Sequence, residues 1–234
     1  MLVALIIFLA VFVQSSTGFG FALVSMPLLV GFLGIQVSAP LVALLASVSE
    51  IFILMRYRHS LNLRVVVQLT VAAVIAIPLG VIALRHIDAA VVTTALGVLL
   101  VGYAVYALFS PRLPQLSGHI WAYGFGFIAG LLGGAYNTPG PPVIIFGNCR
   151  GWPPNEFKGN LQGFFLVNSF VVVAVHAFSG NFNSGVWENA LLAVPGLIAG
   201  LIAGFLLSKR INADLFRKIV LVLLLVLGLR LIIG

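Results

Sequence analysis

Charged residues are scarce in this chain, and acidic residues are the scarcest of all. Only 7% of the 234 residues are charged and five are Asp or Glu, whereas 62% are hydrophobic. Soluble domains carry roughly a quarter charged residues, so this chain has too little polar material to cover a water-soluble globule. The composition therefore predicts an integral membrane protein.

Four further absences narrow the class of protein. The single cysteine, Cys149, cannot form an intrachain disulfide. The apolar runs lack the alternation of barrel strands, and most reach the ~20 residues of a membrane-spanning helix, so we expect a helical bundle. The basic residues give a formal net charge of +7 but occur singly or in pairs, which argues against a nucleic-acid surface. The first twenty residues lack a basic start and a cleavage site, so we expect them to stay in the mature protein.

Catalytic signatures are also missing from the sequence. It contains no zinc pattern of His and Glu, no paired aspartates, no nucleophile elbow and no Walker loop. We therefore expect no enzyme activity, no metal site and no cofactor.

The hydrophobic residues form eight stretches, of which two are unusual. The first and fifth each run to about thirty residues and are interrupted midway, by residues 15–20 (SSTGFG) and by residues 133–142 (GGAYNTPGPP). Glycine and proline clusters make a continuous helix unlikely to form there. The eight stretches are residues 2–33, 36–56, 65–84, 89–109, 119–148, 157–178, 186–207 and 213–233.

Two pairs of markers indicate an internal duplication. A glycine and a proline, Gly20 and Pro27, recur 114 positions later as Gly134 and Pro141. The pattern of residues 80–88 returns 124 positions later, so ten extra residues are expected between the markers in the second half. We therefore predict two repeats within one membrane domain, with an N-terminal repeat of residues 1–112 and a C-terminal repeat of residues 113–234.

The distribution of Lys and Arg distinguishes two topologies. If all eight stretches cross the membrane, the twelve cations divide seven against five between its faces, which is no bias. If the first and fifth stretches enter and leave on one face, ten share a side and only Arg85 and Arg230 lie opposite. We therefore predict an all-α membrane protein with two inverted-topology repeats, each a re-entrant broken hairpin plus three transmembrane helices. The protein would lie in the cell (inner) membrane with both termini on the outer face. The alternative is eight full transmembrane helices in a parallel repeat.

The two interruptions are the first candidates for a binding site. Irregular backbone at membrane depth persists only where protein buries it or where it lines a cavity. Two such breaks are expected to meet near the midplane, where half-helix ends with free N–H groups favour an anion. Close packing of glycines without a ligand is the alternative. The candidate substrate-binding residues, from the breaks and from the sixth stretch, are Gln14, Ser16, Thr17, Gly18, Gly20, Asn137, Thr138, Gly140, Asn160, Gln162 and Asn168.

Two ionisable residues in the flanking stretches are candidates for proton coupling. Glu50 lies in the second stretch and is either a coupling carboxylate or a side chain that snorkels to water. His176 lies near the end of the sixth stretch and is either a proton relay or an interface residue.

The two broken segments resemble those of the TauE/SafE sulfite exporter family. The resemblance is carried by SSTGFGFALVSMPLL in the first half and GLLGGAYNTPGPPVIIF in the second, with the same hydropathy pattern over essentially the whole chain. Asn137 and Pro139 depart from a more glycine-rich pattern, which leaves the substrate open. The positions that match the family's glycine and proline pattern are Gly18, Gly20, Pro27, Gly133, Gly134, Gly140, Pro141 and Pro142.

This resemblance implies a secondary transporter that exports a small sulfur oxyanion or organosulfonate, such as sulfite or sulfoacetate, without ATP. The expected partners are that anion and the lipid bilayer, with no nucleic acid, and the oligomeric state is open, a homodimer being one option. The alternatives are a membrane assembly or chaperone factor without transport and a permease for another small solute.

Overall fold

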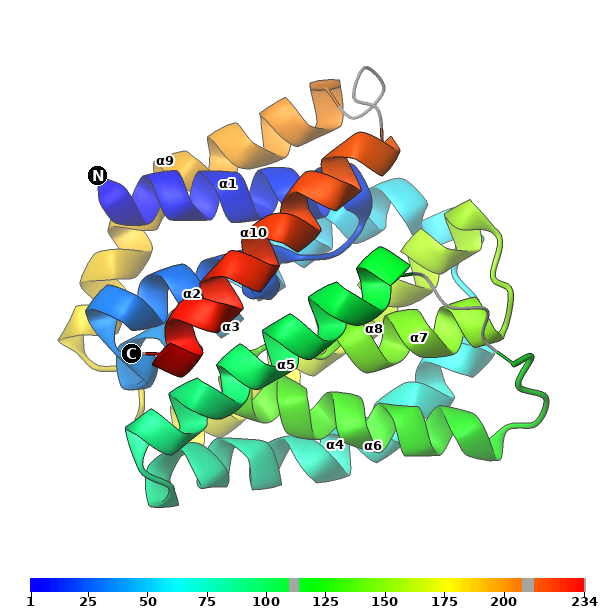
Figure 1. Ribbon diagram of the computed structural model, residues 1–234, viewed down its shortest axis with the longest axis horizontal. Coiled ribbons are helices and arrows are strands. Elements are labelled where there is room, and N and C mark those ends of the chain that lie inside the picture. Colours follow the sequence, from blue (N-terminus) through cyan, green and yellow to red (C-terminus); the bar gives the residue numbers. More distant parts are fainter. Residues whose placement is uncertain (110–113, 208–212, 234) are drawn as a thin grey trace. The chain divides into compact units, whose positions relative to one another are not determined.

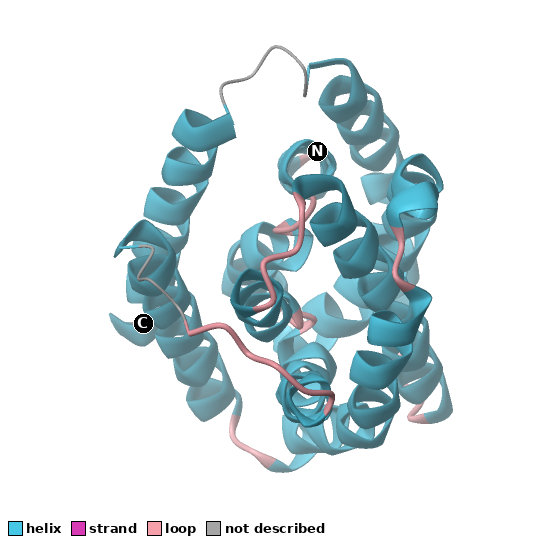
Figure 2. Cartoon of the chain, turned by 90° about the vertical axis from the view of Figure 1, so that its right-hand side faces the viewer, coloured by secondary structure: helices cyan, strands magenta, loops and turns pink. Residues whose placement is uncertain are grey.

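The chain is built of α-helices joined by short loops (Figures 1 and 2). The computed structural model describes residues 1–109, 114–207 and 213–233, and in these ranges it contains helices and loops only. The helices are α1 (Leu2–Thr17), α2 (Phe21–Leu33), α3 (Ile35–Tyr57), the short 3₁₀ helix η1 (Arg58–Ser60), α4 (Leu63–His86), α5 (Ala89–Phe109), α6 (Ile120–Tyr136), α7 (Gly140–Cys149), α8 (Pro154–Phe178), α9 (Ser184–Leu207) and α10 (Ala213–Ile233).

Five helical segments in the described ranges are long and apolar enough to cross a membrane: Ile35–Ser60, Leu63–Ala83, Ala89–Phe109, Pro154–Phe178 and Ser184–Leu207. They correspond to five of the six membrane-spanning helices that were predicted in addition to the two broken stretches. The sixth forms α10, in which some side chains lie outside the described residues. The prediction of a multi-pass helical membrane protein is therefore supported by the lengths and composition of these helices.

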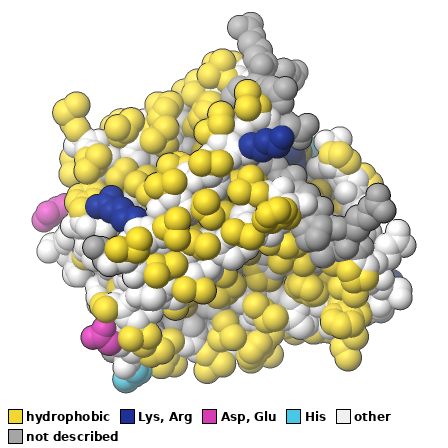
Figure 3. Space-filling view, viewed as in Figure 1, with side chains coloured by type: hydrophobic (Ala, Val, Ile, Leu, Met, Phe, Trp, Pro, Cys, Tyr) yellow, Lys and Arg dark blue, Asp and Glu magenta, His cyan; other side chains and the backbone are white. Residues whose placement is uncertain are grey.

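The surface is as apolar as the composition requires. Figure 3 shows a face on which hydrophobic side chains dominate and Lys, Arg, Asp and Glu are few. Large aliphatic side chains lie on the outside of α9, where Leu191 is 73% exposed. Water would penalise such a surface, whereas lipid chains solvate it.

The first broken stretch forms two short helices, α1 and α2, of 16 and 13 residues. The break lies at residues 18–20, so the prediction that Ser15, Ser16 and Thr17 interrupt the helix is wrong. Their hydroxyls can bond to the preceding turn of an α-helix: Ser15 Oγ donates to the Val11 carbonyl at 2.7 Å and Thr17 Oγ1 to the Val13 carbonyl at 2.9 Å. After the break, α2 turns back along α1 (Figure 1).

The second broken stretch forms α6 and α7, of 17 and 10 residues. Gly133 and Gly134 are helical, and the break is limited to residues 137–139. The prolines at 141 and 142 stand in the first turn of α7, as expected for a ring that fixes φ and needs no N–H partner. The far ends of the two arms meet, because the Leu116 N–H donates to the Cys149 carbonyl at 3.1 Å.

The chain divides into two compact units that do not coincide with its two halves. The first unit comprises Met1–Val42, His86–Arg112 and Asn183–Gly234, and the second comprises Ala43–Arg85 and Leu113–Phe182. Each unit therefore combines one broken hairpin with helices from the other half of the sequence.

In the first unit, α1 runs parallel to α9 and α5 runs antiparallel to α10 (Figure 1). Gly196 faces the backbone of Ala4, and Gly200 faces Phe8 and Val11 one turn further along both helices. A methyl group at Gly228 would lie 2.9 Å from the Gly97 carbonyl and 2.9 Å from Val101. Glycine at these positions allows the helix backbones to touch.

In the second unit, α6 packs along α4 in the same parallel manner. Gly126, Gly130 and Gly134 on α6 face Leu69, Ala73 and Ile77 on α4, one turn apart each time.

The second unit also places α3 against α8 in antiparallel orientation. A methyl group at Gly159 near the start of α8 would lie 3.1 Å from the Tyr57 carbonyl at the end of α3. Further along both helices, Val172 lies in a buried cluster with Ala43, Ile77 and Val81.

The breaks correct the register of the proposed repeat. Gly18 and Asn137 both end a helix in the left-handed conformation, with φ of 92° and 55°, and Asn137 lies 119 positions after Gly18 (137 minus 18). The start of α8 likewise lies 119 positions after that of α3 (154 minus 35), whereas the start of α10 lies 124 after that of α5 (213 minus 89). The helix boundaries therefore favour an offset of 119 over the 114-residue match of Gly20 and Pro27, with about five extra residues instead of ten between the markers.

Five of the twelve cations whose distribution predicted the topology lie wholly or by their side chains outside the described residues. Arg112, Lys209 and Arg210 lie outside the described residues, as do the side chains of Arg85 and Arg217.

Candidate functional site

Asn137 and Thr138 form the turn that separates α6 from α7. The Asn137 N–H donates to the Gly133 carbonyl at 2.9 Å, and the Thr138 N–H donates to the Leu132 carbonyl at 3.3 Å. These bonds satisfy the last carbonyls of α6 in the way a Schellman turn does. The expectation that the N–H groups of Asn137 and Thr138 face a ligand is therefore wrong, although their side chains remain at the break.

The N-terminus of α7 has few backbone donors. A helix leaves its first four N–H groups without intrahelical partners, and here three of the four positions, 139, 141 and 142, are proline. Gly140 alone retains an N–H, and its role as a donor to a ligand stays a prediction. The prolines keep the helix dipole while removing donors that would be costly to leave unpaired away from water.

Polar side chains at the second break are buried and unsatisfied. The Thr138 hydroxyl oxygen and the Asn168 Oδ1 atom have no hydrogen-bond partner among the described residues. Thr138 is 1% exposed and Asn168 is 4% exposed. Because buried polar atoms are normally paired, two orphaned oxygens at one helix break indicate a place for a ligand or water.

Asn168 is positioned by α8, which carries it to the wall of α6 just before the break. A methyl group built on Gly133 would lie 2.7 Å from both Nδ2 and Oδ1 of Asn168, so the amide occupies the space that a side chain would need. Phe165, one turn earlier on α8, faces Gly140 at 3.6 Å from the corresponding methyl position. The break, the Asn168 amide and the Phe165 ring thus belong to one local arrangement in the second unit.

The first break, in the other unit, has a different set of donors. The Gly18 N–H donates to the Gln14 carbonyl at 2.7 Å and caps α1, so its predicted role as a ligand donor is wrong. Gly20 caps the N-terminus of α2 with φ of 106°, and residues 20–23 are all buried. Their N–H groups have no acceptor within α2, so this helix end carries the backbone donors that α7 lacks.

The predicted side chains near the first break lie in the last turn of α1. Gln14 is buried, and Thr17 Oγ1 bonds to the Val13 and Phe19 carbonyls at 2.9 and 2.7 Å. The Ser16 hydroxyl oxygen is buried without a hydrogen-bond partner in the described part of the chain. Hydroxyls at a helix C-terminus present both a donor and lone pairs, and Ser16 is the one here that retains its donor.

Glu50 lies at the contact between α3 and α8. It is 5% exposed, and its Oε2 atom accepts a hydrogen bond of 2.5 Å from Ser169 Oγ. Ser169 was not predicted from the sequence, yet it lies 119 positions after Glu50, the spacing between the two breaks. The carboxylate therefore contacts the neighbouring helix, which disfavours the interpretation that it snorkels to water.

The remaining predicted residues on α8 lie nearer its ends. Asn160 is fully buried, and its Oδ1 accepts the Asn62 N–H at 2.7 Å, which orders the turn before α4. Gln162 is also fully buried. His176, 1% exposed, pairs through Nδ1 with the Asn181 amide at 2.7 Å at the other end of the helix. Asn160 and His176 thus bond to turns at opposite ends of α8, whereas Asn168 lies beside the break.

The fold and these polar positions define a multi-pass helical membrane protein with two broken hairpins. The family model described as "Sulfite exporter TauE/SafE" matches residues 3–231, and the chain belongs to this family. The chain is 26% identical over 197 residues to the "Probable sulfite/organosulfonate exporter TauE" of Cupriavidus necator, covering 82% of this chain and 77% of that protein. No solved structure matches the chain. The predicted family is confirmed, and the family's function as an exporter implies a transporter, not an enzyme.

Proposed function

We propose that this protein is a secondary exporter of a small sulfur oxyanion or organosulfonate, and that the second helix break supplies part of its binding site. The family supports the class of substrate. The observation that carries the site is the pair of buried, unpartnered oxygens on Thr138 and Asn168 beside the N-terminus of α7.

The chemistry of the break suits an oxyanion. The Thr138 hydroxyl and the Asn168 amide can each turn a donor toward an anionic oxygen, and the Gly140 N–H adds a backbone donor at the positive end of α7. These donors can replace the hydration shell without a fixed cationic side chain. Release of the anion is then easier than from a fully charge-paired site.

The first break is proposed to contribute as well, through the buried N-terminus of α2 and the Ser16 hydroxyl. Because its donors are mainly backbone N–H groups, this break selects for anionic charge, whereas the side chains of the second break select for the shape of the substrate. That the two breaks act as one site near the membrane midplane stays a prediction.

We also propose an inverted repeat with re-entrant hairpins, in the cell (inner) membrane with both termini outside. The antiparallel pairing of α5 with α10 and of α3 with α8 supports it, because these are repeat-related helices and a parallel repeat would orient them alike. The contact between Leu116 and Cys149 supports the re-entrant hairpin, since both arms then begin and end at the same side. The division into repeats near residue 112 follows from the same pattern.

Glu50 is the proposed coupling carboxylate. The Ser169 hydroxyl donates to its Oε2 atom, so a relative motion of α3 and α8 would break that bond and change the surroundings of the carboxyl group. Proton movement and the conformational change would then be linked in one residue.

Purified protein in liposomes tests both proposals. Sulfite, sulfoacetate and related sulfonates should move faster than in empty vesicles, and an imposed pH gradient should drive uptake by the wild type. Glu50→Gln should retain exchange down a substrate gradient but lose the response to pH, with Glu188→Gln on the exposed face of α9 as the matched control. Equal flux in protein-containing and empty vesicles would refute the substrate class, and unchanged pH dependence in Glu50→Gln would refute the coupling role.

A further inference from the structure

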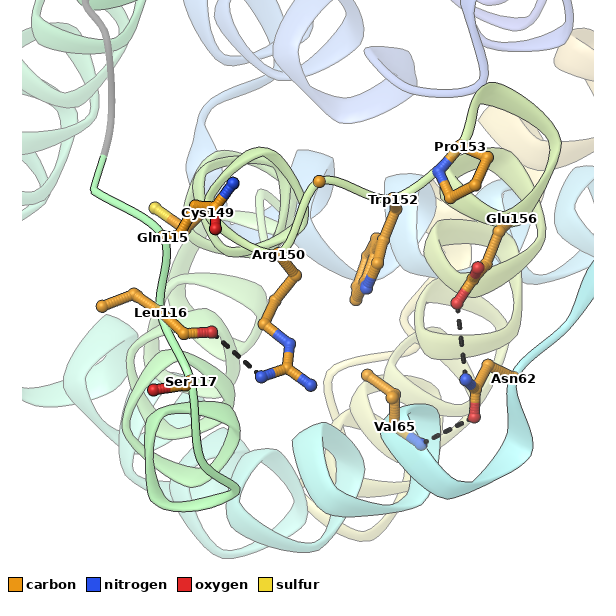
Figure 4. Close-up of a pocket in the computed structure, with 11 residues that line it drawn as sticks. Asn62, Val65, Gln115, Leu116, Ser117, Cys149, Arg150, Trp152, Pro153 and Glu156 are labelled. Atoms are coloured by element: carbon orange, nitrogen blue, oxygen red, sulfur yellow. Dashed lines mark hydrogen bonds between the residues drawn. The ribbon is translucent and has the colours of Figure 1, made fainter.

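A polar cavity lies in the second unit, where the start of α6 and the end of α7 meet the turn before α4 (Figure 4). Its volume is about 470 Å³. It is separate from the helix break, because α7 has ten residues between the two and an α-helix of that length extends about 15 Å. Its polar lining comes from Asn62, Gln115, Ser117, Arg150, Trp152 and Glu156.

Arg150 supplies the positive charge of this cavity. It follows α7 directly, and its Nη1 atom donates to the Leu116 carbonyl at 2.9 Å, which fixes one edge of the guanidinium. In the described part of the chain this guanidinium takes part in no ion pair. Four of its five N–H donors are therefore available for an oxyanion, which guanidinium groups bind through paired hydrogen bonds.

Glu156 supplies the negative charge. It lies in the first turn of α8, and its Oε1 atom accepts long hydrogen bonds of 3.4 Å from the side-chain amides of Asn62 and Asn160. In Figure 4, Glu156 and Arg150 lie on either side of the Trp152 ring. Two opposite charges thus line one cavity without neutralising each other, which indicates a ligand that carries both complementary charges.

The Trp152 ring forms a rigid wall between the two charges. It packs edge-on against Phe146 at 5.6 Å and against Phe157 at 6.2 Å between ring centroids. A methyl group at Gly147 would lie 2.6 Å from this ring, so the glycine permits the close contact. An indole fixed in this way can stabilise a cation over its face and prefers a membrane interface.

We propose that this cavity binds a zwitterion that carries an oxyanion and an ammonium group, with the oxyanion on Arg150 and the ammonium between Glu156 and Trp152. The same chemistry occurs in a phosphatidylethanolamine head group and in a free aminoalkanesulfonate. A small dianion fits less well, because the Glu156 carboxylate would repel it. This site is distinct from the proposed transport site and does not depend on it.

Calorimetric titration of detergent-purified protein tests the charge pattern. Taurine and O-phosphoethanolamine, which carry both charges, should bind, and ethanesulfonate, which lacks the ammonium, should bind roughly tenfold more weakly or worse. Glu156→Gln retains a carbonyl oxygen that can accept from Asn62 and should weaken taurine binding without changing that of ethanesulfonate. Arg150→Gln should weaken both, whereas the exposed controls Arg58→Gln and Glu188→Gln should bind as the wild type does.

Native mass spectrometry with phosphatidylethanolamine and phosphatidylglycerol identifies the source of the ligand. Selective retention of phosphatidylethanolamine that is lost in Glu156→Gln supports a lipid head group, and binding of the soluble zwitterions without lipid selectivity supports a free aminoalkanesulfonate. The proposal is overturned if wild-type protein discriminates neither set of probes, or if Glu156→Gln with an unchanged melting temperature binds them as the wild type does.

Discussion

Three different side chains lie near the second break, where the oxyanion position is proposed. Thr138 belongs to the turn, Asn168 on α8 lies against Gly133, and Phe165 faces Gly140. The arrangement depends on Gly133, because the amide of Asn168 lies where a β-carbon would stand.

Alanine substitutions at two glycines in this region compare a position that has no room for a methyl group with one that has room. Gly133→Ala should push the Asn168 amide aside, lowering the melting temperature and reducing sulfite flux, because the new methyl would lie 2.7 Å from two amide atoms. Gly140→Ala should retain stability, because its methyl would meet Phe165 at an ordinary 3.6 Å. Thermal unfolding and flux in liposomes measure both effects. Equal melting temperatures for the two variants would contradict the packing assigned to Gly133.

For single residues, the sequence indicated which residue types lie at the breaks, but not which of their N–H groups are already engaged in hydrogen bonds. Gly18 and Gly20 marked the first break correctly and Asn137 and Thr138 the second, whereas Thr17, Gly133 and Gly134 proved to be helical. Which N–H groups are engaged depends on hydrogen bonds of the turn, so the capping roles of Gly18, Asn137 and Thr138 were not foreseen. Ser169 was missed because a serine in a helix usually bonds to its own backbone.

Helix pairs in each unit are held by glycines that bring backbones into contact. α1 lies along α9 in one unit, and α6 lies along α4 in the other, each pair parallel and each joining the two halves of the sequence. Such contacts rely on dispersion and close packing, since lipid provides no hydrophobic driving force between helices.

Two glycines on α6 test this packing. Gly130→Ala would place a methyl against the Ala73 backbone and should destabilise the protein by about 1–3 kcal/mol, as overpacking does. Gly124→Ala on the same helix meets open space and should leave stability unchanged or slightly higher. Thermal or denaturant unfolding in detergent compares them. A Gly130→Ala variant as stable as Gly124→Ala would show that the backbone contact is not required.

The helices themselves followed well from hydropathy. The predicted spans matched the observed helices because a bilayer demands long apolar segments, a constraint visible in composition alone. The breaks were placed within a few residues, but serine and threonine side chains extended α1 further than glycine content suggested. The sequence did not predict that each unit combines helices from both halves, because packing partners depend on surface shape and not on periodicity.

The two repeat models predict different membrane topologies for the whole molecule. A re-entrant α6–α7 hairpin places residues 117 and 155 on the same side of the membrane, whereas a fully spanning stretch places them on opposite sides. In a Cys149→Ser background, cysteines introduced as Ser117→Cys and Asn155→Cys should react with a membrane-impermeant maleimide from the same side of oriented vesicles. Labelling from opposite sides would contradict the re-entrant model and favour eight full spans.

The charge pattern predicts the re-entrant topology from sequence alone, because the positive-inside rule counts only the loops. The same count reveals nothing about the substrate, which depends on a few donors inside the bundle. Family membership indicates the class of substrate. The second break contains a residue, Thr138, whose substitution tests whether the anion binds there.

Sulfite flux into liposomes that contain the wild type or Thr138→Val tests the central claim most directly. Valine keeps the shape of threonine and removes a buried hydroxyl that has no partner among the described residues, so the melting temperature should be unchanged or higher. Flux at low sulfite should fall roughly tenfold or more, because an oxyanion would lose a donor at a desolvated site. Wild-type flux in a stable Thr138→Val protein would contradict the account, because the unsatisfied hydroxyl at the break would then have no part in binding the anion.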